Sequence, residues 1–337
     1  MKFSYLCAAA LPLFLAACGG GDSGSSSPTP APTVTPAPTP TPTAPVEPPA
    51  ATFHTKVFDF TTASWTRHGP GVEMNTFTRY EPSGVPNYHL FDHQESELHT
   101  SGGTAETNYA LPTEELSLKY RGYYTGFTKD QMVSSGDWFR YYSKRVPCNP
   151  TSVNDSCAFE TLEVTKSMLY DYVAVGKYQR GGKRFDDTSD ETMRYFLFGS
   201  DSVSSEMPTA STFTYDAGIV TSHPDYDTSG SSSGYQGTGT LTVNFAAGTL
   251  EATIAAKTVT STGNMPFRDD TFKLTGTISS KIRIGGDIVN ADGKYAGKFT
   301  GAFYGPNGSQ LGVVLRLVDA SAPSRPHLIG FLVAKRK

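Results

Sequence analysis

The sequence has few helix signals, few cysteines and no surplus of charge of one sign. Its formal net charge is −4 over 337 residues, with 28 basic and 32 acidic side chains. This balance indicates neither a nucleic acid nor a cation as partner. Beyond the first apolar stretch, no run of residues reaches the length of a membrane-spanning helix, so we expect no later segment to cross a bilayer.

Catalytic motifs are also missing. No Gly-x-Ser-x-Gly turn precedes a helix, so a hydrolase has little support. Three histidines, His89, His93 and His99, stand among acidic residues and could suggest a metal site. The segment has no clear helix signal at either end, and such residues are common on polar surfaces. We therefore predict no enzyme, no metal and no cofactor.

A basic cluster around Lys177 and Arg180 is followed at once by Asp186 and Asp187, which cancel much of its field. We interpret it as a charged loop and predict no nucleic-acid partner.

The four cysteines divide into two groups. Cys7 and Cys18 lie in the N-terminal apolar stretch, whereas Cys148 and Cys157 are nine positions apart in "PCNPTSVNDSC". An even pair in an exported chain predicts a disulfide. A zinc site is the alternative, although no second Cys or His cluster stands at ligand spacing.

The N-terminus has the pattern of an export signal. Lys2 precedes an apolar run that ends in Leu15-Ala16-Ala17-Cys18. This ending resembles the lipobox of bacterial lipoproteins, in which the signal is removed and the cysteine thiol is acylated. We predict a signal peptide over 1–17 and a lipid anchor, including palmitate, at Cys18. An ordinary secretory signal with a chance cysteine is the alternative.

The segment 18–51 is rich in Gly and Ser and then in Pro and Thr. Such a composition cannot bury a core and favours extended polyproline II. We interpret it as a stalk between the anchor and the folded part, in preference to a Pro-rich docking motif.

The remaining chain alternates apolar and polar residues over short runs separated by turn residues, which predicts an all-β fold. We expect a β-rich subdomain over 52–205 and a C-terminal β-barrel over 206–337. In the barrel, Phe299 and Phe303 alternate with Gly297 and Gly301 on one face, as suits a small closed barrel that fills its own interior. The turn at 305–308 joins this strand to the next.

The subdomain 52–205 is aromatic, and the runs 121–127 and 137–145 also carry Arg. Exposed Tyr, Trp and Arg often anchor protein interfaces. We hypothesise that Tyr124, Trp138 and Arg140 lie in loops and contribute to a ligand-binding surface. The alternative is that most of these aromatic residues pack in the core.

Three stretches carry a resemblance to a known family. "GKFTGAFYGPNGSQLG" and "IGFLVAKRK" resemble the end of the C-terminal barrel of transferrin-binding protein B and its relatives, and "GTGTLTVNFAAGTLEATI" resembles the opening barrel hairpin. Gln310 and Val313 depart from the family pattern, and the chain has room for one lobe where that protein has two. The chain thus resembles a single-lobe relative.

This resemblance implies an eight-stranded antiparallel barrel with a handle-like subdomain, displayed on the outer membrane of a Gram-negative cell. It also implies capture of a host or environmental protein, or of a haem- or iron-bearing ligand, beside a TonB-dependent receptor. An adhesive or structural surface lipoprotein is the alternative from another class. A barrel that holds a small molecule inside is disfavoured by the alternating Gly and aromatic face.

Overall fold

The computed structural model describes residues 64–80, 89–99, 105–136, 139–147, 156–165, 170–183, 188–222, 233–260, 269–319 and 327–337. The predicted signal peptide, Cys18 and the stalk lie outside these ranges. The regular elements within them are β-strands and two short 3-10 helices, η1 (Lys129–Gln131) and η2 (Pro306–Gly308). No helix in the described part of the chain is long and apolar enough to cross a membrane.

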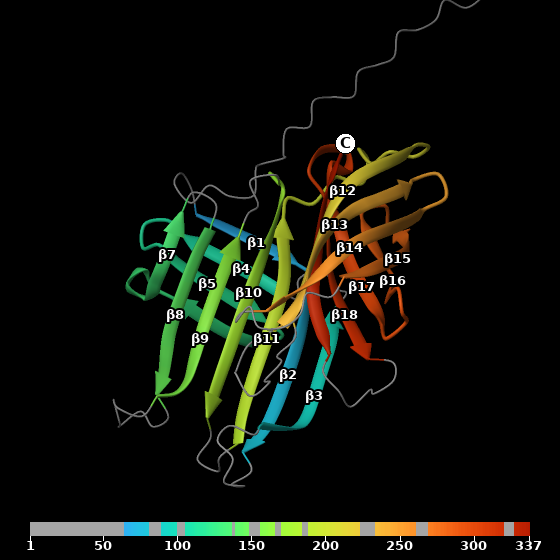
Figure 1. The fold of residues 1–337 in the computed structure, drawn as a ribbon. Coiled ribbons are helices and arrows are strands. Elements are labelled where there is room, and N and C mark those ends of the chain that lie inside the picture. Colours follow the sequence, from blue (N-terminus) through green and yellow to red (C-terminus); the bar gives the residue numbers. More distant parts are fainter. Residues whose placement is uncertain are drawn as a thin grey trace, which may run out of the picture. The chain divides into compact units, whose positions relative to one another are not determined.

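The C-terminal strands form a closed, antiparallel, eight-stranded barrel (Figure 1), which confirms the predicted fold. Each strand pairs with the next along the chain, and β19 returns to pair with β12 as well as with β18. This closure leaves no free sheet edge. The strands are β12 (Thr212–Ser222), β13 (Ser233–Asn244), β14 (Thr249–Thr260), β15 (Asp269–Ser279), β16 (Arg283–Asn290), β17 (Tyr295–Tyr304), β18 (Gln310–Asp319) and β19 (Leu328–Arg336).

The barrel interior is filled by side chains from all eight strands. Phe299 of β17 is part of this core, and its ring occupies space that two glycines leave free. A Cβ atom on Gly276 or Gly286 would lie 2.7 or 2.9 Å from the end of this ring. Gly276 and Gly286, on the neighbouring strands β15 and β16, therefore leave the space in which a bulky aromatic side chain fits inside the lumen.

The turn between β17 and β18 has the left-handed backbone expected of its residues. Asn307 has φ 53°, and the flanking Gly305 and Gly308 have φ 71° and 66°. Tyr215 of β12 donates a 2.7 Å hydrogen bond to the Gly308 carbonyl, which fixes the turn to a strand that pairs with neither β17 nor β18.

The N-terminal part forms two sheets. One has four strands in the order β1-β4-β5-β6, and the other has seven in the order β3-β2-β11-β10-β9-β8-β7. The strands of the first are β1 (Trp65–Gly69), β4 (Ala105–Ala110), β5 (Glu115–Tyr120) and β6 (Tyr123–Phe127). Those of the second are β2 (Gly71–Tyr80), β3 (His89–His99), β7 (Met132–Gly136), β8 (Phe139–Pro147), β9 (Ser156–Thr165), β10 (Val173–Lys183) and β11 (Thr188–Gly199).

The seven-stranded sheet is packed on both faces. One face meets the four-stranded sheet in a core that includes Tyr120, Tyr142 and Tyr178. The other face meets the outer wall of the barrel in a core that includes Leu197 and Val314. Because β11 is covered on both sides, Tyr195 to Phe198 are all buried, and the run lacks the polar alternation of a half-exposed strand.

Candidate functional site

The four-stranded sheet has one face in the core and one face open to solvent. Along β4 and β5 the buried and accessible positions alternate strictly. We call the accessible side the outer face. Its described residues are Thr66 and His68 on β1, Glu106, Asn108 and Ala110 on β4, Glu115, Ser117 and Lys119 on β5, and Tyr124 and Gly126 on β6.

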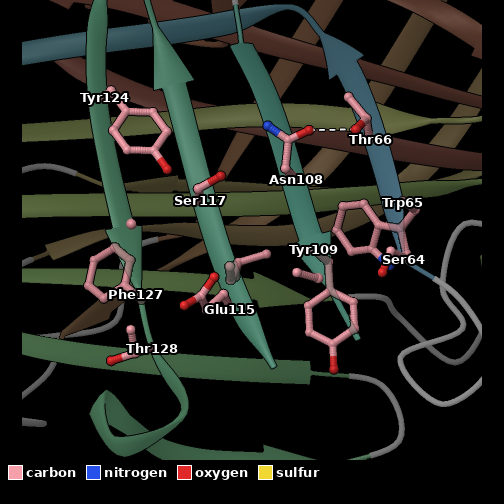
Figure 2. A pocket seen from close by; sticks show the side chains of 13 residues that line it. Ser64, Trp65, Thr66, Asn108, Tyr109, Glu115, Ser117, Tyr124, Phe127 and Thr128 are labelled. Atoms are coloured by element: carbon pink, nitrogen blue, oxygen red, sulfur yellow. Dashed lines mark hydrogen bonds between the residues drawn. The ribbon is translucent and has the colours of Figure 1, made fainter. Parts of the chain in front are cut away.

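A hollow of about 600 Å³ lies on this outer face. Strand register places Thr66 beside Asn108, Asn108 beside Ser117, and Ser117 beside Gly126, so one row of short side chains crosses all four strands. Figure 2 shows Thr66, Asn108 and Ser117 of this row, with the larger side chains of Tyr124, Tyr109 and Trp65 around them. The hollow therefore exists because the sequence places small residues at the same level of each strand.

Tyr124 is the exposed aromatic residue of the hollow. Its relative exposure is 66%, the largest among the exposed hydrophobic side chains of the described residues. Its ring leans over Gly126, where an added Cβ atom would lie 3.5 Å from the Tyr124 hydroxyl. An exposed ring of this kind offers apolar area and a hydrogen-bonding group at low entropic cost.

The opposite side of the hollow is polar, and its side chains are hydrogen-bonded to one another. Thr66 Oγ1 donates a 2.5 Å hydrogen bond to Asn108 Oδ1, drawn in Figure 2. Asn108 Nδ2 in turn donates a 3.0 Å hydrogen bond to Glu106 Oε1. The bond from Asn108, with smaller contributions from Lys119 and His68, lowers the pKa of Glu106. This carboxylate is therefore ionised at neutral pH.

Glu115 also lines the hollow. Its carboxylate is exposed, and no cation among the described residues pairs with it. The nearby Glu114 is instead paired with Lys129 at 2.7 Å. The lining thus contributes one unmatched negative charge to the outer face.

Aromatic residues form the boundary of the hollow that lies toward the bottom of Figure 2. Trp65 stacks on Tyr109 with ring centroids 5.7 Å apart and on Phe198 at 5.8 Å. Burial raises the pKa of Tyr109, and it raises the pKa of Tyr142, behind it, to about 12. These phenols stay protonated at physiological pH, so this boundary of the hollow is uncharged.

A buried network behind β6 holds the strand that carries Tyr124. Glu160 of β9 is 5% exposed and accepts hydrogen bonds from Tyr123 at 2.8 Å and Thr125 at 2.7 Å. Lys144 of β8 lies 3.2 Å from the same carboxylate and donates to the Gly126 carbonyl at 2.9 Å. The alternate residues of β6 are therefore tied to the seven-stranded sheet, while Tyr124 faces outward.

The predicted ligand-binding residues are placed differently from one another. Tyr124 and Arg140 lie in strands β6 and β8, not in loops. Tyr124 lines the hollow, whereas Arg140 is half-buried, donates to the carbonyls of Gly136 and Phe139, and lies close to Tyr109. Trp138 lies outside the described residues.

The other predicted sites stay untested. Cys148 lies outside the described residues, as does Cys18, and nothing is described of the Cys157 side chain in β9, so the disulfide and the lipid site remain predictions. His89, His93 and His99 lie on strand β3. Within the described ranges, no three His, Cys, Asp or Glu side chains are grouped as metal ligands would be.

Sequence reasoning missed Thr66, Asn108 and Gly126. A row across four strands depends on register, and a single sequence does not give the register of separate strands. The alternation of small polar residues in "AETNYA" and "ELSLKY" was the signal available for which face is open.

Comparison with known proteins assigns the barrel to a known family. Residues 207–336 match the family model of the C-lobe and N-lobe beta barrels of Tf-binding protein B. This confirms, for the barrel, the resemblance expected from the sequence. None of the curated proteins compared with the sequence matches it.

Solved structures of low similarity also match. A tryptophan-to-alanine variant of transferrin-binding protein B from Haemophilus parasuis Hp5 is 11% identical with a TM-score of 0.36, over 82% of this chain and 76% of that one. The isotype 1 protein from serogroup B Neisseria meningitidis is 12% identical with a TM-score of 0.36, over 78% of this chain and 63% of that one. At these TM-scores only the family model supports the assignment.

Proposed function

We propose that this chain is an outer-membrane lipoprotein that captures a host or environmental protein, including one that bears iron or haem, without acting as an enzyme. Three features support the proposal: the transferrin-binding protein B type of barrel, the lipobox-like ending at Cys18, and the Pro-rich stalk. The solved proteins that match are named for transferrin binding. The partner of this chain belongs, in the proposal, to the same broad class of protein ligands.

The observation that carries the proposal is the contrast between the barrel and the four-stranded sheet. The barrel interior is packed with side chains that are almost fully buried. The outer face instead has a hollow of about 600 Å³ with Tyr124 exposed at its edge. Recognition in this proposal takes place on the surface of the handle-like subdomain, where a flat partner surface can reach the aromatic and acidic groups.

Capture of partners by the full chain tests the proposal. Cells that display the wild-type chain are incubated with host serum or growth medium, and retained proteins are identified by mass spectrometry. The same capture is repeated with Tyr124→Ala, and with Val133→Ala as a control, because Val133 on β7 is exposed to a similar extent, at 62%. We expect Tyr124→Ala to reduce retention of the partner at least tenfold, as for a central interface residue, and Val133→Ala to leave it unchanged.

Two results would separate the alternatives. Equal retention by both variants would remove the outer face from the proposal. Attachment of the displaying cells to host surfaces or matrix components would favour an adhesive lipoprotein, provided that loss of the chain has no effect on growth under iron restriction. Nutrient capture would be supported by a retained partner that carries iron, together with a growth defect of cells lacking the chain that depends on a TonB-dependent receptor.

The anchor is tested separately. Metabolic labelling with an alkyne-bearing palmitate is expected to label the wild-type chain and not Cys18→Ser, with Cys157→Ser as the control that keeps its label. Label on Cys18→Ser would contradict the proposed anchor.

A further inference from the structure

A second hollow lies between the seven-stranded sheet and the outer wall of the barrel. Its volume is about 360 Å³, within the range of roughly 300 to 1,000 Å³ that small-molecule sites occupy. We call it the interlayer groove. Both of its walls belong to well-paired strands, β10 and β11 on one side and β12 and β19 on the other. The groove is thus part of the fold.

The walls of the interlayer groove are apolar. The sheet contributes Val173, Val175 and Tyr195, and the barrel contributes Val220 and Phe331. The ring centroids of Tyr195 and Phe331 are 5.5 Å apart, so the two layers are in contact at this side of the groove. Val220 and Phe331 are opposite each other on the outer barrel wall, a position that is polar on strands facing only water. Their apolar character therefore fits a covered surface.

Two charged residues stand at the rim of this groove. Lys177 and Glu163 are directly opposite each other on β10 and β9, and both line the groove. Lys177 and Arg180 thus lie in a strand, and the interpretation of this cluster as a charged loop was wrong. They do not form an ion pair within 4 Å. Glu163 Oε1 instead accepts a 2.8 Å hydrogen bond from Thr165 on its own strand. Of the charged groups that the structure describes, none is paired with the half-buried Lys177.

The remaining polar groups are already satisfied. The Tyr195 hydroxyl lies 2.6 Å from Ser222 Oγ, and the Tyr170 hydroxyl donates to the Val333 carbonyl at 3.1 Å. A ligand therefore meets an apolar interior and, at one end, the Lys177 ammonium group, which can donate a hydrogen bond to it. This combination is complementary to a molecule with an apolar chain and an anionic head.

We propose that the interlayer groove binds a small amphipathic carboxylate, with its alkyl chain between the sheet and the barrel and its carboxylate at Lys177. This site is separate from the outer face and does not depend on protein capture. Its ligand class follows from the apolar walls, which exclude a strongly polar molecule, and from the sign of the unpaired charge. Glu163 weakens the affinity because it is a like charge for the ligand head.

Decanoate is the probe for the test. Isothermal titration uses the full-length chain carrying Cys18→Ser, so that its own acyl groups are absent. We expect saturable binding of one decanoate per chain. Lys177→Met is expected to weaken binding about tenfold, the size of one charge-assisted hydrogen bond, and Glu163→Gln to strengthen it about threefold by removing a like charge. Methyl decanoate is expected to bind the Lys177→Met variant and the parent chain equally.

Filling the groove gives a second, independent measurement. Val175→Trp should abolish decanoate binding, whereas Val289→Trp, at a 38% exposed position on another part of the barrel wall, should not change it. Thermal unfolding shows whether each variant is folded. If Val175→Trp does not fold, Lys177→Met and Glu163→Gln decide the question. No saturable binding, or affinities that Lys177→Met and Glu163→Gln leave unchanged, would overturn the proposal. Capture of a protein partner is measured separately, so the two proposals can fail independently.

Discussion

The Tyr123 hydroxyl lies 2.8 Å from Glu160 and also 2.8 Å from the hydroxyl of Tyr178. These contacts connect β6 of the four-stranded sheet with β9 and β10 of the seven-stranded sheet. Glu160 also faces Lys144, at 3.2 Å, and Arg180, at 3.7 Å. A buried carboxylate with this many donors fixes how the strand bearing Tyr124 sits on the layer behind it.

Replacement of Glu160 should destabilise the protein strongly. Glu160→Gln keeps the shape of the side chain but leaves the Lys144 ammonium without its buried counter-charge. Breaking a buried ion pair in this way costs about 3 kcal/mol or more in the free energy of unfolding. Urea unfolding followed by tyrosine fluorescence measures it. Glu163→Gln, on the same strand but facing the groove rim, should change stability by less than about 0.5 kcal/mol, and equal losses in the two variants would refute the assignment.

The same carboxylate predicts how stability depends on pH. Burial raises the pKa of Glu160, but hydrogen bonds from Thr125 and Tyr123 and the charge of Lys144 outweigh burial, and the pKa lies below its ordinary 4.5. A lowered folded-state pKa gives stability that is complete above the unfolded-state value and is lost as pH falls through the folded-state value. The difference in melting temperature between wild type and Glu160→Gln should therefore shrink below about pH 4.5 and stay constant from pH 6 to 8. A difference that grows on acidification would contradict this sign.

Two buried tyrosines should respond in opposite directions to loss of the hydroxyl. Tyr304 is fully buried, and its hydroxyl has no hydrogen bond to any group in the described part of the chain. Burial raises its pKa, so the phenol stays neutral. Tyr304→Phe should stabilise the protein by about 1 kcal/mol because a desolvated and unsatisfied group is removed. Tyr215→Phe should destabilise it by a similar amount, since this hydroxyl donates to the Gly308 carbonyl.

Thermal unfolding of the two phenylalanine variants checks both signs. A loss of stability in Tyr304→Phe would show that the hydroxyl has a hydrogen-bond partner after all.

Packing inside the barrel should depend on Gly286. A Cβ atom there would lie 2.1 Å from the Thr275 carbonyl oxygen and 2.9 Å from the Phe299 ring. Gly286→Ala should cost about 2 kcal/mol, as other overpacked cores do. Gly285→Ala is the matched control, because the nearest atom to its Cβ would be the Phe299 carbonyl oxygen at 3.4 Å. Guanidinium unfolding of both variants measures the difference, and equal stability would contradict the proposed tight packing.

The barrel could be predicted from the sequence because each of its strands carries a local signal. Phe299 and Phe303 alternate with glycine, and the turn residues Gly305 and Asn307 adopt the left-handed backbone that their chemistry favours. Consecutive strands are also neighbours in the sheet. Local pattern and global arrangement therefore agree throughout this part of the chain.

The candidate site could not be predicted in the same way. Tyr124 was identified by residue type, but it was expected in a loop. Arg140 lies in a strand, and its guanidinium donates hydrogen bonds to the carbonyls of Gly136 and Phe139. The row from Thr66 to Gly126 joins residues 60 positions apart in numbering, through register that depends on the whole sheet. Tertiary context, and not local pattern, decides which aromatic residue faces solvent.

Strand β19 (Leu328–Arg336) is hydrogen-bonded to both β12 and β18. β19 is synthesised after the other seven strands of the barrel, so β12 and β18 each keep an unpaired edge until β19 is available. The barrel therefore cannot close before its eighth strand has been made, and until then its open edges can pair with other chains unless another protein covers them.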